Sequence, residues 1–452
     1  MIDGAEVAVI GAGSVGIAVA YYLVKALRVK DVVLIDSREP MSLTSAQSGE
    51  NYRNWWPHPV MTAFTDHGIS LLEEIDRESG GRLNMTRGGY ALVTRRPKPE
   101  DLIQDLHRGY GATPARIRLR ESASCDYQSP QRAPWSAAPD GVDVLLNQDL
   151  IRKTFPSYAH DVATVIHIRR AGSISAPQLG QFMLEAIRAD GARLIRAEVI
   201  GIGGKSPFTL ELASGEGVKK IRAGRIVNAA GPFLRDIGAM LGEDLPVKCV
   251  YQQKIAFQDR DEAIPRNMPF SIDLDGQTLA WTDEDRALLA GEPATRHLIE
   301  PMNGGIHCRP DGAAEGTWVK LGWAYNDVAS DPHAEDPMDI QFPDTVLRGA
   351  SRLNPKLATY IGRLPRGSRH YGGYYTMTEE NWPLIGKMKT EGAFIAGALS
   401  GFGSMAACAT GALCAAWVVG KSVPEYARLL SGDRYAEPAL MAQLGELSKG
   451  SL

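Results

Sequence analysis

Three glycines near the start of the chain have the spacing of a site that holds a pyrophosphate. The segment Gly11-Ala12-Gly13-Ser14-Val15-Gly16 matches the pattern G-x-G-x-x-G. In this pattern the first glycine permits a tight turn, the second lets the backbone approach a phosphate, and the third lets helix and strand pack closely. Asp36, which precedes Ser37, comes 20 residues after Gly16, where a carboxylate would accept hydrogen bonds from an adenosine ribose. These residues predict a dinucleotide site.

The segments around the glycines support this prediction. Residues 7–10 are an apolar run that predicts a buried parallel strand, and residues 17–27 predict a helix directly after the glycines. Residues 31–35 predict a second buried strand that ends at Asp36. The N-terminus of the helix would offer free N–H groups and the positive end of its dipole to the phosphates. The alternative is an ordinary glycine-rich turn with Asp36 as a surface cap.

The composition limits what the chain can do. Its 452 residues favour two or three domains, and a net charge of −4 without runs of like charge argues against a nucleic-acid or polybasic membrane surface. The five cysteines are scattered, so we expect the reducing cytoplasm and no metal site. We also expect no signal peptide, because a strand begins almost at once. The long uncharged stretch 393–420 is interpreted as a buried strand, loop and helix, not as a membrane span.

The rest of the chain alternates between α/β segments and segments typical of antiparallel sheet. Helices are predicted at 60–75, 178–191, 338–361 and 406–419, the last being the final core helix. Strands are predicted at 88–94, 194–202, 208–213, 218–223, 225–231, 247–257, 304–309, 317–325 and 394–397. Residues 115–141 lack periodicity and are predicted to be a loop or insertion.

Four segments together resemble one enzyme superfamily. They are the N-terminal glycine motif, residues 174–202, RIVNAAGPF at 225–233, and GGYYTMTEENWPLIG with the following IAGALSGFG at 372–403. In order and spacing they resemble the FAD-dependent amine oxidoreductases that include D-amino-acid oxidase, glycine oxidase and monomeric sarcosine oxidase. The resemblance implies an α/β fold (α+β overall) in which a Rossmann-type FAD-binding domain is interleaved with a mixed, largely antiparallel substrate domain. The FAD-binding domain would comprise 1–85, 150–243 and 365–452, and the substrate domain 86–149 and 244–364.

The resemblance also implies which residues contact FAD. The pyrophosphate and ribose contacts fall on the glycine motif and on Asp36 and Ser37, and a small polar loop along the flavin falls on Ser45, Ser48 and Gly49. The adenine would meet Val199, and the turn beside the adenosine falls on Ala230 and Gly231. The glycine loop at the pyrimidine edge of the flavin falls on Gly401, Phe402, Gly403, Ser404 and Met405. This loop precedes a helix predicted to begin near Ala406, whose N-terminal dipole would stabilise negative charge on a reduced flavin.

Lys320 is the candidate catalytic residue. It lies in Trp318-Val319-Lys320-Leu321-Gly322-Trp323, which resembles the strand of monomeric sarcosine oxidase that carries a lysine facing the flavin. Because a strand alternates its faces, Lys320 shares a face with Trp318 and Gly322. A cation beside the flavin would stabilise the superoxide formed as O2 takes its first electron. The alternative is a strand lysine whose ammonium reaches solvent.

The chain departs from the family pattern at three positions. Some sarcosine oxidases tether their flavin to a cysteine where this chain has Gly373, so we expect non-covalent FAD. The usual histidine of the Ser-Gly-His-Gly loop is Phe402 here, and the lysine that would hold a substrate carboxylate is Met405. The substrate is therefore either not a small amino acid, or its carboxylate is held elsewhere.

Other residues could bind the substrate. Arg53 has a forked donor suited to a carboxylate, although it could instead pair with Glu50 or contact the cofactor. Tyr251, Trp323 and Tyr375 could form an aromatic wall that receives an amine, or could simply pack within a sheet.

The predicted function is flavin-dependent oxidation of a C–N bond of an amine or amino acid. A hydride would pass to FAD, the imine would hydrolyse, and the electrons would go to O2 to give H2O2. Three alternatives remain: an FAD dehydrogenase that passes electrons to a quinone or partner protein, an NAD enzyme without flavin, and a non-catalytic FAD-binding subunit. The particular amine, its chirality and the oligomeric state stay open.

Overall fold

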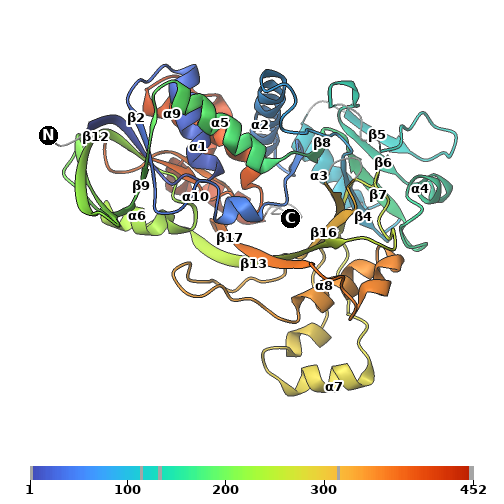
Figure 1. Ribbon diagram of the computed structural model, residues 1–452. Coiled ribbons are helices and arrows are strands. Elements are labelled where there is room, and N and C mark those ends of the chain that lie inside the picture. Colours follow the sequence, from blue (N-terminus) through green and yellow to red (C-terminus); the bar gives the residue numbers. More distant parts are fainter. Residues whose placement is uncertain (1–3, 112–115, 131–134, 313–315, 447–452) are drawn as a thin grey trace.

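A computed structural model of the chain describes residues 4–111, 116–130, 135–312 and 316–446. Two large sheets organise these residues (Figure 1). One contains the N-terminal strands, and the other is built from strands that lie between residues 90 and 377. The chain crosses between the two sheets several times, so each is built from segments far apart in the sequence. The α/β class and the interleaved architecture that the sequence predicted are confirmed.

The first sheet is largely parallel and runs in the order β10-β11-β12-β1-β2-β9, with β19 also paired to β12. Its strands are β1 (Gly4–Ile10), β2 (Val32–Asp36), β9 (Arg193–Arg196), β10 (Glu198–Gly203), β11 (Phe208–Ser214), β12 (Gly217–Asn228), β18 (Leu384–Lys387) and β19 (Ala393–Gly397). β1, β2, β9, β12 and β19 run parallel. Their carboxyl ends therefore meet at one edge, which is where open α/β sheets bind ligands.

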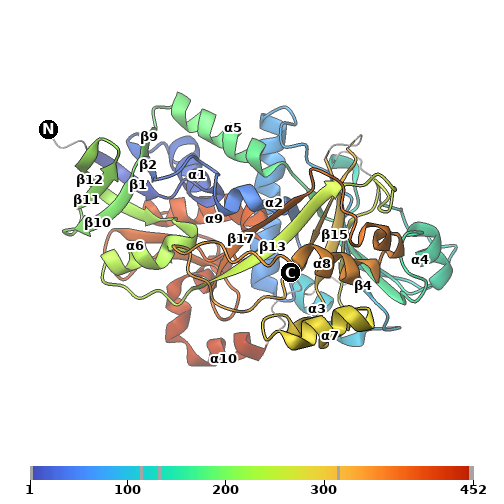
Figure 2. The same cartoon turned by 60° about the horizontal axis from the view of Figure 1, so that its bottom comes forward.

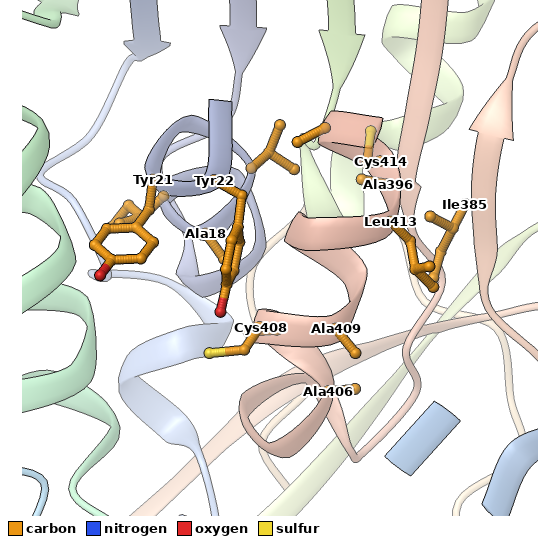
Figure 3. Close-up of a cluster of buried hydrophobic side chains, with 14 of the residues drawn as sticks. Ala18, Tyr21, Tyr22, Ile385, Ala396, Ala406, Cys408, Ala409, Leu413 and Cys414 are labelled. Carbon is orange, nitrogen blue, oxygen red and sulfur yellow. The ribbon is translucent and has the colours of Figure 1, made fainter. Parts of the chain in front are cut away.

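Helices from both ends of the chain pack against each other on this sheet. The helices are α1 (Ser14–Tyr21), α2 (Pro59–Glu78), α3 (Glu100–Tyr110), α4 (Gln148–Thr154), α5 (Ala176–Ala189), α6 (Leu234–Met240), α7 (Asp283–Gly291), α8 (Phe342–Ser351), α9 (Gly403–Val418) and α10 (Pro438–Glu446). A Cβ at Gly411 of α9 would lie 2.5 Å from the backbone of Ala18 of α1, so the two helices are almost in backbone contact. Figure 3 shows the Tyr22 ring extending from the end of α1 towards Cys408 of α9. This contact fixes the C-terminal glycine loop relative to the N-terminal glycine motif.

The second sheet runs in the order β17-β13-β16-β15-β14-β4-β7-β6-β5. Its strands are β4 (Tyr90–Thr94), β5 (Ile117–Arg120), β6 (Val142–Leu145), β7 (Thr164–Ile168), β13 (Lys248–Gln258), β14 (Phe270–Asp273), β15 (Ile306–Asp311), β16 (Trp318–Gly322) and β17 (Arg369–Met377). The long strands β13 and β17 lie side by side at one edge of the second sheet and reach towards the first (Figure 2). A separate two-stranded pair joins β3 (Asn51–Arg53) to β8 (Ala171–Ser173).

Several segments differ from the sequence prediction. Part of the predicted loop 115–141 forms β5, because Ile117 to Arg120 pair in parallel with β6; residues 115 and 131–134 lie outside the described residues. The predicted strand 194–202 is two strands, β9 and β10, which pair with different partners. The hairpin strand 218–223 and the strand 225–231 are one strand, β12.

The C-terminal helices also differ from the prediction. The predicted helix 338–361 divides into α8 and a 3₁₀ turn at Pro355–Tyr360. α9 begins at Gly403 instead of near Ala406, and it is not the final helix, because α10 follows it. The uncharged stretch 393–420 forms β19, a loop and α9, and no helix of the described residues is long and apolar enough to cross a membrane.

Two strands pair across the predicted domain boundaries. Strand β7 lies within the segment 150–243, which the sequence assigned to the FAD-binding domain, but it pairs with β4 and β6 of the second sheet. Strand β17 lies within 365–452 and pairs with β13 of the second sheet. The sequence does not show which sheet either strand joins, because that depends on pairing with strands far away in the chain.

The buried His167 in β7 predicts loss of stability in acid. Burial and the nearby Arg169 charge lower the pKa of His167 to about 3, and its ring nitrogens face Tyr127 Oη at 2.8 Å and Gly88 O at 3.0 Å. An unfolded histidine has a pKa near ~6.5, so the unfolded chain binds an extra proton as the pH falls below that value. Between pH 7.5 and 5 this histidine should therefore lower the free energy of unfolding by about 2 kcal/mol.

Urea unfolding of wild type and His167→Gln at the two pH values measures this effect. We expect the variant to lose about 2 kcal/mol of the wild-type pH dependence. The exposed His160 provides the control, and His160→Gln should leave the dependence unchanged. An equal pH dependence in wild type and His167→Gln would contradict the prediction.

Candidate active site

A cavity of about 470 Å³ lies at the carboxyl edge of the first sheet. We call it the edge cavity. It is lined by the residues that directly follow β1, β2, β9, β12 and β19. Predicted cofactor residues in its lining are Gly11, Gly13, Ser14, Val15, Asp36, Ser37, Ser45, Val199, Ala230, Gly231 and Gly403. The parallel strands therefore bring together residues that are almost 400 positions apart in the sequence (403 − 11).

The glycine motif forms a tight turn between β1 and the N-terminus of α1. Gly11 has φ +107°, and its N–H donates to Ile35 O at 2.8 Å. A Cβ at Gly16 would lie 1.9 Å from Gly11 O, so Gly16 does not line the cavity but lets α1 pack against the turn. The Ser14 N–H donates to Ser45 Oγ at 3.0 Å. The first turn of α1 thus faces the cavity, as a phosphate site requires.

Asp36 closes this turn from the end of β2. Its Oδ2 accepts from the Ala12 N–H at 2.7 Å and its Oδ1 from the Arg38 N–H at 2.8 Å. Each carboxylate oxygen has a second lone pair, so the side chain can hold the turn and still accept hydrogen bonds from a ribose. The structure therefore gives Asp36 a local structural role in addition to the ligand contact that the sequence suggested.

A second, smaller cavity lies between the first sheet and the face of the second sheet that carries Tyr375. We call it the inner cavity. Predicted residues in its lining are Ser48, Gly49, Tyr375, Gly401, Phe402, Ser404 and Met405. Strand β17 separates the two cavities, because Tyr374 and Thr376 line the edge cavity while Tyr375 lines the inner one.

The N-terminus of α9 lies between the cavities and is held in a strained turn. Ala398 and Ser400, just before it, have φ +58° and +45°, values that side chains other than glycine seldom adopt. A Cβ at Gly401 would lie 2.6 Å from the Tyr375 ring, so only glycine lets the loop pass this tyrosine. Ser404 Oγ lies 2.7 Å from Ser48 Oγ, which links α9 to the loop after β2.

The residues present fit FAD. The edge cavity offers a helix N-terminus, a glycine turn and a carboxylate, which are the groups that bind an ADP moiety. Two buried polar atoms beside the cavities have no hydrogen-bond partner in the structure: Thr44 Oγ1 at the edge cavity and Asn51 Oδ1 at the inner cavity. Native proteins seldom leave such atoms unpaired, so a polar ligand would satisfy both. The N-terminus of α9 would place positive dipole charge where the flavin ring is expected.

Lys320 is part of a half-buried charge cluster next to the inner cavity, not of its lining. Its Nζ lies 2.7 Å from Glu50 Oε2 and 3.4 Å from Asp311 Oδ2. Arg309 donates to Gly49 O and pairs with Asp311 at 2.8 Å. Burial alone would raise the pKa of Asp311, but the Arg309 and Lys320 charges lower it below its usual range. The cluster fixes the loop of Gly49 and Glu50, which does line the cavity.

Three predicted substrate residues lie outside the inner cavity. Arg53 is fully buried, with its guanidinium over the rings of Trp56 at 4.5 Å and Tyr90 at 5.6 Å, and burial lowers its pKa to about 10. Tyr251 and Trp323 face away from the cavity because they alternate with residues that face it. The Trp323 Nε1–H donates to Asn303 O at 3.1 Å within a separate core. The aromatic wall predicted from Tyr251, Trp323 and Tyr375 is therefore not formed.

Two polar residues of the inner cavity were missed by the sequence analysis. Lys254 on β13 and His307 on β15 both line it. Burial and the Lys254 charge lower the pKa of His307 to about 4, so its imidazole is neutral at neutral pH. Lys254 stands in a strand whose interior is otherwise a continuous buried run. The sequence gives no clear signal for it, because the polar Gln252 and Gln253 precede Lys254 in the same strand.

Geometry and comparison together define the class of protein. The edge cavity has the groups that suit a dinucleotide at the edge of a parallel sheet, and the inner cavity lies beside it. A family model described as "DAO: FAD dependent oxidoreductase" matches residues 6–417, so the chain belongs to this family of FAD-dependent oxidoreductases.

Curated and solved relatives agree with this assignment. Human mitochondrial dimethylglycine dehydrogenase is 28% identical over 292 residues, which cover 63% of this chain but only 30% of that protein. The L-proline dehydrogenase of P. horikoshii has a TM-score of 0.71 at 17% identity and covers 97% of this chain and 99% of its own. Glycine oxidase from Geobacillus kaustophilus has a TM-score of 0.67 at 17% identity, with 95% and 98% covered.

Proposed function

We propose that this protein oxidises the C–N bond of an amine or amino acid with non-covalent FAD and passes the electrons to O2. The observation that carries the proposal is the inner cavity, which borders the N-terminus of α9 and has a largely uncharged lining. The names of the three relatives described above refer to amino acids with primary, secondary or tertiary nitrogen. The overall reaction is amine plus O2 and water to carbonyl compound, smaller amine or ammonia, and H2O2.

The side chains of the inner cavity are suited to orient an uncharged amine. Tyr90, Phe270, Phe402 and Met405 exclude water from it, and exclusion of water strengthens every polar contact inside. His307 is neutral, so it adds no positive charge to the lining. Bound FAD would supply the redox chemistry by accepting two electrons from the carbon next to nitrogen. The chain itself orients the substrate, excludes water from the inner cavity and supplies the dipole of α9.

Anaerobic titration of the yellow holoprotein tests the function. Glycine, sarcosine, dimethylglycine, both enantiomers of proline and simple amines without a carboxylate form the panel. We expect at least one amino acid to bleach the flavin absorbance near 450 nm within seconds to minutes, and H2O2 to appear when air is admitted. Glycolate and glycerol 3-phosphate serve as matched substrates without nitrogen. Bleaching by these alone, or by none of the compounds, would contradict C–N oxidation.

The second candidate is a dehydrogenase that passes electrons to a quinone or a protein. It is favoured by one observation: Lys320, the proposed oxygen-activating cation, is paired with Glu50 and does not line the inner cavity. The same experiment separates the two, because a dehydrogenase would stay bleached in air and would recover only with an added quinone or dye.

A further inference from the structure

Lys254 is a buried cation that points at the inner cavity. It is 7% exposed, and its neighbours across the sheet are Gly322 of β16 and Tyr371 of β17. A Cβ at Gly322 would lie 2.4 Å from His307 Nε2 and 3.1 Å from Lys254 Cγ. Because Gly322 has no side chain, the methylene chain of Lys254 and the ring of His307 can pack together beside the cavity.

The surroundings of Lys254 differ from those of the nearby cations Lys320 and Arg309. Lys320 and Arg309 both have carboxylate partners. In the described part of the chain no ion pair within 4.0 Å involves Lys254. Its Nζ has a phenol instead, with Tyr375 Oη at 3.4 Å and the Tyr375 ring centroid at 5.3 Å. A buried ammonium without an anion is strongly unfavourable, so this position calls for an anionic ligand.

The polar groups around Lys254 complement an amino acid. Tyr375 can donate its O–H to the anion that Lys254 attracts. Burial and the Lys254 charge lower the pKa of His307 to about 4. His307 is therefore neutral and adds no second positive charge beside Lys254. Asn51 Oδ1, also in the cavity lining, is a buried acceptor without a partner and could receive an N–H.

We propose that Lys254 binds the substrate carboxylate, with Tyr375 as its hydrogen-bonding partner. The preferred substrates are then amino acids and not simple amines, and Lys254 replaces the cation that is missing at Met405. Arg53 does not bind the carboxylate, because its guanidinium is buried between the rings of Trp56 and Tyr90. The inference rests on the proposed function, since it names the substrate class of the same site.

Binding of inert carboxylates tests the role without turnover. Acetate and 2-furoate are titrated into the holoprotein, and the perturbation of the flavin absorbance gives Kd. Acetamide and 2-furamide are the neutral isosteres. We expect Lys254→Met to weaken the two carboxylates about 10- to 100-fold, the range for a lost charge-assisted hydrogen bond. The amides should change less than about threefold, and Lys254→Arg should retain most carboxylate binding.

Lys248 provides a matched control on the same strand. It is exposed and lies 3.8 Å from Glu379, so Lys248→Met should leave every Kd unchanged. If Lys254→Met does not retain FAD, Lys254→Gln replaces it, because the amide keeps a polar head in the cavity. Carboxylate Kd values within threefold of wild type in the variant that retains FAD would overturn the inference.

The outcome is separable from the proposed function. If amines bleach the wild-type flavin but Lys254→Met binds carboxylates normally, C–N oxidation stands and this inference falls. If carboxylate binding depends on Lys254 but no amine bleaches the flavin, the anion site stands and the proposed reaction falls.

Discussion

Replacing Gly13 by valine is expected to give a folded protein that no longer retains FAD. Gly13 has φ −74°, which any residue adopts, and a Cβ there would meet only Ser45 Oγ at 3.2 Å. The chain therefore tolerates the side chain, but the isopropyl group would project into the edge cavity beside the first turn of α1. Because that turn is the expected pyrophosphate position, FAD affinity should fall more than about 100-fold, the loss of several phosphate hydrogen bonds.

Flavin absorbance per mole of purified protein measures the effect, and titration of the apoprotein with FAD gives Kd. Gly203→Val is the control, since Gly203 lies in β10 with no atom within 4 Å of its Cβ position and does not line the cavity. Circular dichroism and thermal unfolding of the apoproteins confirm that both variants fold. A yellow Gly13→Val protein with wild-type affinity would show that the pyrophosphate does not lie at this turn.

Lys320→Met is expected to slow reoxidation by O2 about 100-fold while changing anaerobic reduction less than about threefold. A half-buried cation such as Lys320 stabilises the negative charge that O2 gains with its first electron, and it acts more strongly there than a cation in bulk water would. Reduction of the flavin by substrate creates no such charge on O2. Stopped-flow absorbance measures the two half-reactions separately. Equal slowing of both, or of neither, would remove Lys320 from the oxygen reaction.

The ion pair with Glu50 requires a second variant. Removing Lys320 leaves Glu50 with its weaker ion pair to Arg309 at 3.6 Å, and this half-buried, less neutralised carboxylate would itself disfavour an anionic oxygen species. In Lys320→Met/Glu50→Gln this carboxylate is neutral. If reoxidation stays slow in the double variant, the missing cation is the cause; if it recovers, Lys320 acts only by neutralising Glu50. Lys320→Arg, which keeps the charge, should stay near the wild-type rate.

The sequence predicted which residues gather at the edge cavity. The strand, glycine turn and helix of residues 4–21 are followed closely by β2, so short-range spacing was enough to group Gly11, Gly13 and Asp36, which all line it. The resemblance placed the distant Val199, Ala230 and Gly403 in the same lining. Their contacts with FAD stay predictions that the Gly13 variant and similar ones can test.

The substrate half was predicted less well, because it depends on which strands pair. The alternation of β16 placed Trp323 opposite Lys320, and pairing with β17 places Tyr375 on the face of Lys254 but Tyr251 on the other. A single strand shows which of its residues share a face, but not which face meets the cavity. Arg53 was misplaced for a similar reason: its short strand β3 pairs with β8 and turns the guanidinium into the core.

The sequence by itself determined the fold class, the family and the turn that holds a dinucleotide, because these depend on short-range spacing and on segments whose order is fixed along the chain. Tertiary structure alone decided which side chains face the inner cavity, that Lys320 is paired with Glu50, and that no carboxylate of the described residues lies within 4.0 Å of Lys254. The physical reason is that the charge balance of a buried site is a sum over all neighbours in space. The neighbours of Lys254 come from β13, β15 and β17, which only the folded sheet brings together.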